Sequence, residues 1–563
     1  MSAAISPPLT GRRPIFAAAA IAGMLVTLYS VNLGGWRTLG AHEALAAVPA
    51  RAMADGSGDW LIPDFGGIPR VKKPPLGYWL IAASIRLTGV ADEFAARLPS
   101  ALSAVALAGL IGSWGARWYG RRAGLAAALV QGTSLWALTY GRKSEVDITL
   151  SLLTAAALFL AVGTRDRGPV GRVRLRWIAV WALAGLGWLG KFHFIPCLIA
   201  APLVGHWLLC GRTHKWRTAC SPIGVGLFLL LALPWTAWMA ANVPAATDAW
   251  FVQTAGRAGG ELGVRSLGFY PLQLLILTLP WTPCWLLIAA RTFRRSGRKA
   301  ASAWRRTSNG PLGRQLQAAL RSVTGRSAEA KERATRDLFP WVWLATTVFV
   351  LSLSLGRNRH YLLPALPACS LAAGRGAAVF WAICRNGWAW AGWLRGPRTA
   401  VASWLLPMAG TAAFAVVMLT IAPSADGRAA NARFVRSLPA RSPIDEPILV
   451  LGMGESSALW HLPSGARRTE TADGLAAALT ENRRLAVLAD RRSIPLIDEC
   501  ATRWRAAGGS FAVRWIAAET EAPEPRDNAF EPMHGLRFAV IEVGPTVRPL
   551  VRSSSRDDSV IRR

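Results

Sequence analysis

Two short stretches of this sequence carry acidic residues at the borders of apolar segments. One is the pair His42-Glu43, which follows the first long apolar run. The other is YGRKSEVDITL, Tyr140 to Leu150, which holds Asp147 between two further apolar runs. Ionisable side chains next to hydrocarbon are costly unless they bind something. We therefore take His42, Glu43 and Asp147 as candidate catalytic residues.

Basic residues lie in the same loops, although the outer loops of a membrane protein normally contain few of them. A phosphate at a membrane surface needs several cations, and Lys and Arg supply donors without acceptor lone pairs. Taken singly, each residue is equally well explained as an anchor that extends to lipid headgroups. As a set, we interpret them as a binding site for a lipid phosphate: Lys72, Lys73, Arg142, Lys191, Arg359 and His360.

Carboxylates beside a phosphate site suit the transfer of a sugar from a lipid phosphate. The leaving phosphate must be stabilised, and a general base must take the proton of the attacking hydroxyl or amine. Such a reaction needs no nucleotide outside the cell.

The elements that must hold these residues are membrane-spanning helices. The chain has 563 residues, 52% of them hydrophobic, and a formal net charge of +32. We expect a polytopic α-helical membrane protein with about 11 to 13 transmembrane helices, because apolar runs of spanning length recur along it. These runs lie near residues 15–33, 97–116, 122–140, 147–163, 176–190, 192–210, 220–241, 268–290, 338–355, 361–382 and 399–422.

The positive charge lies in the turns between these runs. If the spans alternate, the Arg-rich turns fall on one side, which the positive-inside rule assigns to the cytoplasm. The N-terminus is then cytoplasmic, and the chain after residue 422 lies outside the membrane. Because the basic residues form no single patch, nucleic acid is not an expected partner. Membrane lipids are expected partners.

Two loops of the membrane domain, residues 1–425, are longer than connectors. In the first outer loop, residues 34–96, the pieces Glu43–Asp55 and Pro75–Leu87 are expected to be short helices on the membrane surface. The second piece places Tyr78 and Trp79 at the interface. The other loop, residues 291–336, is basic and cytoplasmic, and we expect it to lie on the anionic inner leaflet or to be disordered.

Residues 426–563 differ from the rest of the chain and predict a small α/β domain. Strand-type runs occur in PILVLGM, RLAVLAD and RFAVIEV, and a helical stretch covers residues 473–481. The motif GMGESS after the first strand is a poor match to a dinucleotide fingerprint. The seven cysteines form neither a CxxC metal motif nor a disulfide framework, so no metal site is assigned.

The stretch HEALAAVPARAMADGSGDWLIPDFGGIPRVKKPPLGYWLI, His42 to Ile81, resembles the first outer loop of the bacterial lipid-A aminoarabinose transferases. These are polyprenyl-phosphate-sugar glycosyltransferases of the protein-mannosyltransferase-like superfamily, of GT-C type. Further similarities occur in order along residues 15–425, in RLPS at Arg97, LGWLGKF around Lys191, ALPW at Ala232 and RHYLLPALPA at Arg359.

The resemblance implies an undecaprenyl-phosphate sugar donor, a lipid, glycan or protein acceptor, a role in lipid A modification of the cell envelope, and a bacterial inner membrane with the C-terminal domain in the periplasm. Residue by residue, Lys73 matches the lysine that contacts the phosphate, Glu43 the second acid of the first motif, and Asp147 the second acidic site.

The sequence also departs from the family pattern. His42 stands where the family has its leading aspartate, and Lys72 replaces the glutamate before the phosphate-contacting lysine. Histidine can act as a general base, but it cannot supply a carboxylate's charge opposite an oxocarbenium ion. Glu43 or Asp147 can supply it. The loss of the acid at Lys72 weakens the case for a divalent metal.

Three readings follow from these observations. The first is a glycosyltransferase that uses a polyprenyl-phosphate sugar. The second is a transporter of lipid-linked sugars, for which internal repeats would be expected and none is found. The third is a catalytically divergent family member that only binds such lipids, which the altered first motif favours.

Overall fold

The computed structural model describes residues 13–35, 37–163, 170–210, 219–258, 264–306, 321–324, 327–353, 358–386, 428–441, 446–452, 458–518 and 536–546, with the single positions 315, 318, 412 and 416. The chain divides into two compact units. The first, here the helical unit, comprises residues 1–31, 100–237 and 253–416. The second, here the mixed unit, comprises residues 32–99, 238–252 and 417–563.

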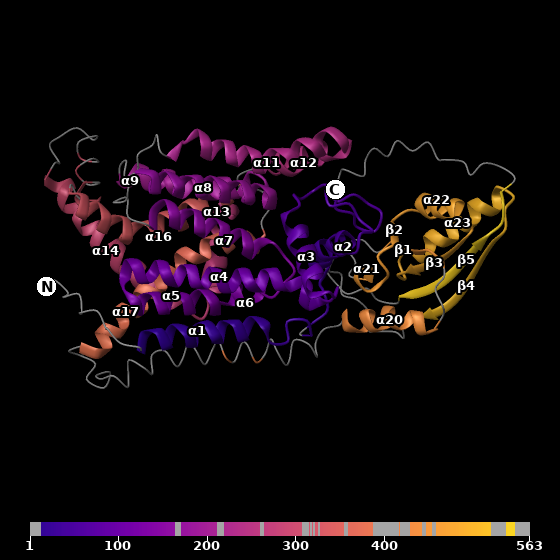
Figure 1. The fold of residues 1–563 in the computed structure, drawn as a ribbon, viewed down its shortest axis with the longest axis horizontal. Coiled ribbons are helices and arrows are strands. Elements are labelled where there is room, and N and C mark those ends of the chain that lie inside the picture. The colour runs from indigo at the N-terminus through magenta and orange to yellow at the C-terminus, as the bar shows by residue number, and fades with distance from the viewer. Residues whose placement is uncertain are drawn as a thin grey trace. The chain divides into compact units, whose positions relative to one another are not determined.

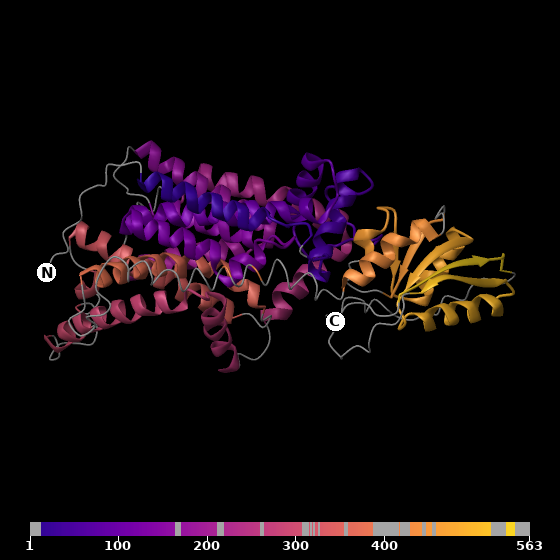
Figure 2. The same ribbon diagram turned by 90° about the horizontal axis from the view of Figure 1, so that it is seen from below.

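Most helices of the helical unit run roughly parallel to one another (Figures 1 and 2). The described helices of this unit are α1 (Arg13–Ser30), most of α4 (Glu93–Tyr119), α5 (Arg121–Thr133), α6 (Leu135–Tyr140), α7 (Asp147–Leu158), η1 (Phe159–Gly163), α8 (Val170–Lys191), α9 (Phe194–Cys210), most of α11 (Pro222–Asn242), part of α12 (Pro244–Ala258), α13 (Val264–Leu277), α14 (Thr282–Arg306), α16 (Ala328–Ser352), η2 (Arg359–Ala365) and α17 (Leu366–Asn386).

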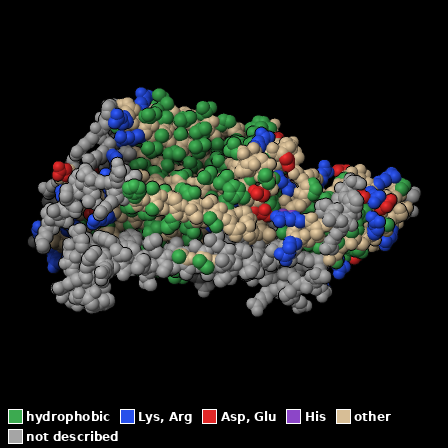
Figure 3. Space-filling view, turned by 60° about the horizontal axis from the view of Figure 1, so that its bottom comes forward, with side chains coloured by type: hydrophobic (Ala, Val, Ile, Leu, Met, Phe, Trp, Pro, Cys, Tyr) green, Lys and Arg blue, Asp and Glu red, His purple; other side chains and the backbone are tan. Residues whose placement is uncertain are grey.

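These helices are apolar enough to form a membrane domain. Three described helical stretches combine spanning length with high hydropathy, Glu93–Tyr119, Pro222–Asn242 and Arg359–Val379, and shorter apolar helices accompany them. Hydrophobic side chains cover much of the surface shown in Figure 3. The expected spans up to residue 382 each coincide with one or more helices, and the expected span at 399–422 lies outside the described residues apart from two positions.

Small residues allow the central helices to approach closely. A Cβ added to Gly374 of α17 would lie 2.6 Å from the carbonyl oxygen of Ala123 in α5, so only glycine fits there. Close backbone approach at small residues is the usual way in which helices associate in membranes, because lipid provides no hydrophobic driving force between them.

The expected single span at 268–290 is wrong. The structure has two helices there, α13 and α14, with a turn between Leu277 and Thr282. Pro280 and Pro283 lie at this break. Proline has no N–H to donate and interrupts a helix that would otherwise continue.

The mixed unit contains a five-stranded sheet in the order β2-β1-β3-β5-β4. The strands are β1 (Ile448–Leu451), β2 (Arg467–Thr469), β3 (Arg484–Ala489), β4 (Phe511–Ala518) and β5 (Arg537–Val543), and the helices are α2 (Ala41–Asp55), α3 (Leu76–Thr88), α20 (Arg428–Arg441), α21 (Ala458–His461), α22 (Ala472–Glu481) and α23 (Ile494–Ala506). β1 pairs in parallel with β2 and β3, whereas β5 is antiparallel to β3 and β4.

The central strands of the sheet are buried on both faces, and β1 shows how the chain achieves this. Leu449 and Leu451 belong to a core formed with α22 and α23. The alternate residues Ile448 and Val450 belong to a second core, which includes α2, α3, α20 and α21. Because side chains alternate across a strand, one short apolar run serves both cores.

Residues of the first outer loop therefore belong to a hydrophobic core that they share with the C-terminal strands. The expected helices are present as α2 and α3, and α2 ends at Gly56, whose positive φ of 85° suits glycine at a helix C-terminus. The expected placement of Tyr78 at a lipid interface is wrong, because Tyr78 is buried in the core shared with the C-terminal strands. Trp79 is partly buried, and its Nε1 donates to the carbonyl of Trp60 at 2.8 Å.

The basic segment 291–336 is not a disordered loop over its described parts. Residues 291–306 continue α14, and α16 begins at Ala328. The Ser327 hydroxyl accepts from the Ala330 amide at 3.1 Å, which satisfies one orphan donor at the start of α16.

Candidate functional site

The candidate residues fall into two groups, one in each unit. The mixed unit holds His42, Glu43, Lys72 and Lys73. The helical unit holds Arg142, Asp147, Lys191, Arg359 and His360. Each group is built by its own elements.

Glu43 is the centre of a buried charge network in the mixed unit. It lies in the first turn of α2. Its Oε2 accepts a hydrogen bond from the Gly40 amide at 3.0 Å and another from Nη2 of Arg37 at 2.8 Å. Its Oε1 accepts Nε of Arg97 at 3.0 Å. Glu43 is 1% exposed and Arg97 is 0% exposed.

Arg97 makes further bonds that fix the chain before α2. Its Nη1 donates to the carbonyl of Leu33 at 3.0 Å, and its Nη2 donates to the carbonyl of Thr38 at 3.3 Å. One guanidinium thus connects the start of α4 with residues 33–43. This geometry favours a positioning role for Glu43.

The electrostatics of Glu43 agree with that role. Burial alone raises the pKa of its carboxyl, but the charges of Arg97 and Arg37 and the hydrogen bond from Gly40 outweigh burial and lower the pKa to about 2. Glu43 is therefore ionised at neutral pH. A carboxylate with so low a pKa is a weak proton acceptor, so it is poorly suited to act as a general base.

His42, Lys72 and Lys73 are exposed residues of the same unit. His42 lies beside Glu43 in the first turn of α2. The two lysines occupy the turn before α3, and this turn is held by Nε1 of Trp250 in α12, which donates to the carbonyl of Val71 at 2.7 Å. The structure thus keeps the lysines at the surface on a fixed backbone.

Asp147 and Lys191 form an ion pair in the helical unit. Asp147 begins α7 and is 7% exposed, whereas Lys191 ends α8. Each charge has the sign that its helix end favours. The Lys191 ammonium also lies 4.4 Å from the ring centre of Tyr361 and 5.5 Å from that of Phe194. The aromatic rings stabilise the cation through their faces.

Further charged and aromatic residues surround this pair. The Lys143 ammonium lies 4.3 Å from the Tyr140 ring and 3.7 Å from Oε1 of Glu145. The Tyr140 ring is 5.8 Å from that of His360, which is 4.6 Å from that of Tyr361. The sequence-predicted residues Asp147, Lys191 and His360 are thus brought together by way of Tyr361.

Two other predicted residues are placed differently. Arg359 is exposed at the start of η2, next to His360. Arg142 is buried, and its guanidinium donates to the carbonyls of Leu28 at 2.6 Å and Val31 at 2.8 Å. It thereby satisfies orphan carbonyls at the end of α1. This favours a structural role for Arg142, and its assignment to a phosphate stays a prediction.

The sequence reasoning missed Arg37, Arg97 and Tyr361. Arg97 could have been found, because it is a basic residue at the outer end of an expected span, where such residues are depleted. The contact of Tyr361 with Lys191 joins residues 170 positions apart, and no local pattern indicates it.

Comparisons with known proteins support the fold. A family model described as dolichyl-phosphate-mannose-protein mannosyltransferase matches residues 72–238. The crystal structure of ArnT from Cupriavidus metallidurans bound to undecaprenyl phosphate superposes with a TM-score of 0.67, at 17% identity over 93% of this chain and 97% of that one. The apo oligosaccharyltransferase of Archaeoglobus fulgidus gives a TM-score of 0.50, at 10% identity over 93% and 76%.

In its fold, the chain is similar to these two proteins, which are of GT-C type. Among curated relatives, it is 28% identical over 270 residues to an undecaprenyl phosphate-alpha-4-amino-4-deoxy-L-arabinose arabinosyl transferase of Edwardsiella ictaluri, which covers 46% of this chain and 48% of that protein. The chain thus spans about half the length of such relatives. Its fold is that of a polytopic helical membrane protein with a C-terminal α/β domain.

Within the described ranges of the chain, no group of three or more His, Cys, Asp or Glu side chains is placed to hold a metal ion. Glu145 and Asp147 of the helical unit each have a lysine partner.

Proposed function

We propose that this protein is a bacterial inner-membrane glycosyltransferase. It moves a sugar from a polyprenyl phosphate, such as undecaprenyl phosphate, to a lipid, glycan or protein acceptor on the periplasmic face. The proposal is supported by the GT-C fold and by relatives named as undecaprenyl phosphate-dependent arabinosyl transferases. A lipid A acceptor is consistent with the sequence resemblance.

The single observation that carries the proposal is the Asp147-Lys191 pair with its aromatic and basic neighbours. In the reaction, the acceptor oxygen or nitrogen forms a bond to the anomeric carbon while the bond from that carbon to the phosphate oxygen breaks. The polyprenyl phosphate leaves with the electron pair, and the acceptor proton passes to a base. Asp147 supplies negative charge opposite the developing oxocarbenium ion, and Lys191 with Lys143 or Arg359 stabilises the leaving phosphate.

The residues of the first motif take different roles in this proposal. By the sequence resemblance, His42 stands at the position of the family's leading aspartate and is the candidate base, because a ring nitrogen of its imidazole can accept a proton. Glu43 positions His42 through the fixed first turn of the helix. Lys73, and secondarily Lys72, are the mixed unit's candidates for contacts to the same phosphate, an assignment that rests on the sequence resemblance alone.

The proposed topology has the N-terminus in the cytoplasm and the C-terminal domain in the periplasm. It rests on the bias of Lys and Arg toward one set of turns. Reaction of single cysteines with a membrane-impermeant thiol reagent in intact spheroplasts tests it, at Ser464 in the C-terminal domain and at Ser296 in α14. Labelling of Ser296→Cys without labelling of Ser464→Cys would reverse the orientation.

The activity is tested by label transfer. The purified protein is incubated with polyprenyl-phosphate sugars carrying a radiolabel and with membrane acceptors, and product is measured for wild type, His42→Ala, Lys73→Ala and Asp147→Asn. Arg491→Ala is the control, because Arg491 is an exposed residue of the C-terminal domain. Transfer that is lost in Asp147→Asn and Lys73→Ala and kept in Arg491→Ala supports the proposal.

A second candidate function is a protein that binds or transports lipid-linked sugars without transferring them. The engagement of both Glu43 oxygens, together with a histidine in place of the family aspartate, favours it. Retention of the labelled lipid by wild type with no transfer to any acceptor fraction would support this candidate and contradict the enzyme.

A further inference from the structure

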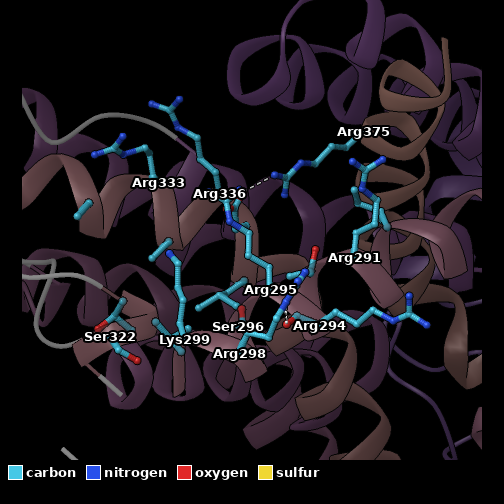
Figure 4. A pocket seen from close by; sticks show the side chains of 18 of the residues that line it. Arg291, Arg294, Arg295, Ser296, Arg298, Lys299, Ser322, Arg333, Arg336 and Arg375 are labelled. Carbon is cyan, nitrogen blue, oxygen red and sulfur yellow. Dashed lines mark hydrogen bonds and ion pairs between the residues drawn. The ribbon is translucent and has the colours of Figure 1, made fainter. Parts of the chain in front are cut away.

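A large basic cavity lies in the helical unit between α14, α16 and α17. Its volume is about 1200 Å³, which exceeds that of a typical small-molecule pocket. The basic side chains that line it come from three helices and are visible in Figure 4: Arg291, Arg294, Arg295, Arg298, Lys299, Arg333, Arg336 and Arg375. Among the described residues that line the cavity, Asp337 is the one carboxylate.

The spacing in α14 explains why so much charge gathers there. Arg291, Arg295 and Arg298 are four and three residues apart, which puts them on one face of the helix. The helix contains no acidic residue between Thr282 and Arg306. Like charges at this spacing each cost the helix a few tenths of a kcal/mol, so the arrangement is unfavourable without an anion.

The neighbouring helices contribute cations that are already oriented. Nη2 of Arg375 pairs with Oδ1 of Asp337 at 2.6 Å, and its guanidinium lies 5.2 Å from the ring centre of Tyr119. Nη2 of Arg336 pairs with Glu332. Within the part of the chain that the structure describes, no carboxylate pairs with the arginines and lysine that α14 contributes to the cavity.

The cavity is also continuous with a surface that suits lipid. Leu286 and Leu287 of α14 are 43% and 40% exposed, and they precede Arg291 by about one turn. Ile288, Leu338 and Val379 line the cavity itself. An apolar surface that ends at several arginines is complementary to a lipid. The acyl chains can lie along the apolar surface while the headgroup contacts the cations.

We propose that this cavity binds the headgroup of an anionic lipid that carries more than one phosphate. Several separate arginines can each bind phosphate oxygens bidentately, and the cavity is larger than one phosphate requires. On the proposed topology the lipid belongs to the inner leaflet, on the side opposite the sugar-transfer chemistry. The inference does not depend on that chemistry.

The test measures lipid retention by the full chain. The protein is delipidated in detergent and reconstituted in phosphatidylcholine nanodiscs that contain cardiolipin, which has two phosphates, or phosphatidylglycerol at equal total charge. Bound lipid is then quantified by mass spectrometry. We expect cardiolipin to be retained over phosphatidylglycerol and to bind roughly 30-fold more weakly to the double variant Arg295→Gln with Arg298→Gln, on the basis of about 1 kcal/mol per basic residue.

The matched control is the double variant Arg305→Gln with Arg306→Gln. It removes the same charge from the same helix at residues that do not line the cavity. Circular dichroism in phosphatidylcholine alone checks that both variants fold. An equal loss of cardiolipin in the two variants would overturn the site, and equal retention of phosphatidylglycerol would overturn the requirement for two phosphates. Displacement of cardiolipin by inorganic pyrophosphate at comparable concentration would overturn the lipid source and assign the cavity to a soluble phosphate compound.

Discussion

Nε of Arg97 donates to Oε1 of Glu43 at 3.0 Å, although the two residues are 54 positions apart. Both side chains are buried, with side-chain exposures of 0% and 1%. The pair joins the start of α4 to the start of α2, and Arg97 adds bonds to the carbonyls of Leu33 and Thr38. The first motif is therefore held in place by a charge network whose main partner lies outside the motif.

Glu43→Gln should destabilise the mixed unit. The variant leaves the buried guanidinium of Arg97 without a counter-charge, and breaking a buried ion pair in this way costs about 3 to 5 kcal/mol. Thermal unfolding of the purified protein should show a lower transition temperature. Glu481→Gln is the control, because Glu481 pairs with Arg467 at an exposed site and such pairs contribute about 1 kcal/mol or less. Equal stability of the two variants would argue against an anchoring role for Glu43.

The same network predicts a pH dependence of stability. Glu43 has a folded-state pKa of about 2, below its ordinary value of 4.5. A depressed pKa contributes stability that is fully present above the ordinary value and is lost as the pH falls toward the folded value. The contribution is about 3 kcal/mol. The difference in unfolding free energy between wild type and Glu43→Gln should therefore be constant above pH 5 and shrink toward pH 3. A difference that grows on acidification would contradict this assignment.

The fold class could be predicted from the sequence because runs of high hydropathy indicate membrane-spanning helices. The runs that predicted strands are present as β1, β3 and β5, and residues 473–481 lie in α22. The three-residue strand β2 has no apolar run, and Arg514 divides the apolar residues of the half-exposed β4, so the sequence analysis did not indicate either strand. The break between α13 and α14 was missed because hydropathy stays high across Pro280.

The sequence predicted less of the candidate site than of the fold. Composition drew attention to Glu43 and Asp147, since carboxylates are rare near spans. Their partners Arg97 and Lys191 are distant in sequence, and only the structure pairs them. The burial of Tyr78 could not be foreseen either, because a helix whose apolar face meets a folded domain has the same pattern as one whose apolar face meets lipid.

Arg51→Ala should loosen the contact between α2 and α21 within the mixed unit. Nη2 of Arg51 donates to the carbonyl of Leu459 at 2.9 Å, and its guanidinium lies 5.4 Å from the ring centre of Trp460. The loss of hydrogen bonds from a charged donor costs about 1.5 to 3 kcal/mol. We expect faster cleavage near residue 460 in limited proteolysis. Arg433→Ala, at an exposed position of α20, is the control and should cleave as wild type does. Identical cleavage of both variants would contradict this contact.

Two variants of the Asp147-Lys191 pair can distinguish a structural role of Asp147 from a catalytic one. Asp147→Asn removes the carboxylate charge and should lower sugar transfer by on the order of 100-fold or more, the usual effect of removing one group that stabilises a transition state. The exchange variant Asp147→Lys with Lys191→Asp keeps an ion pair between the same two helices but moves the negative charge to the other helix end. If the pair were only structural, the exchange would restore transfer together with stability. We expect it to recover part of the thermal stability that Asp147→Asn loses and none of the transfer, whereas Asp498→Asn, at an exposed position of α23, should leave both unchanged. Initial rates of label transfer and unfolding temperatures, measured on the same preparations, decide between the two roles.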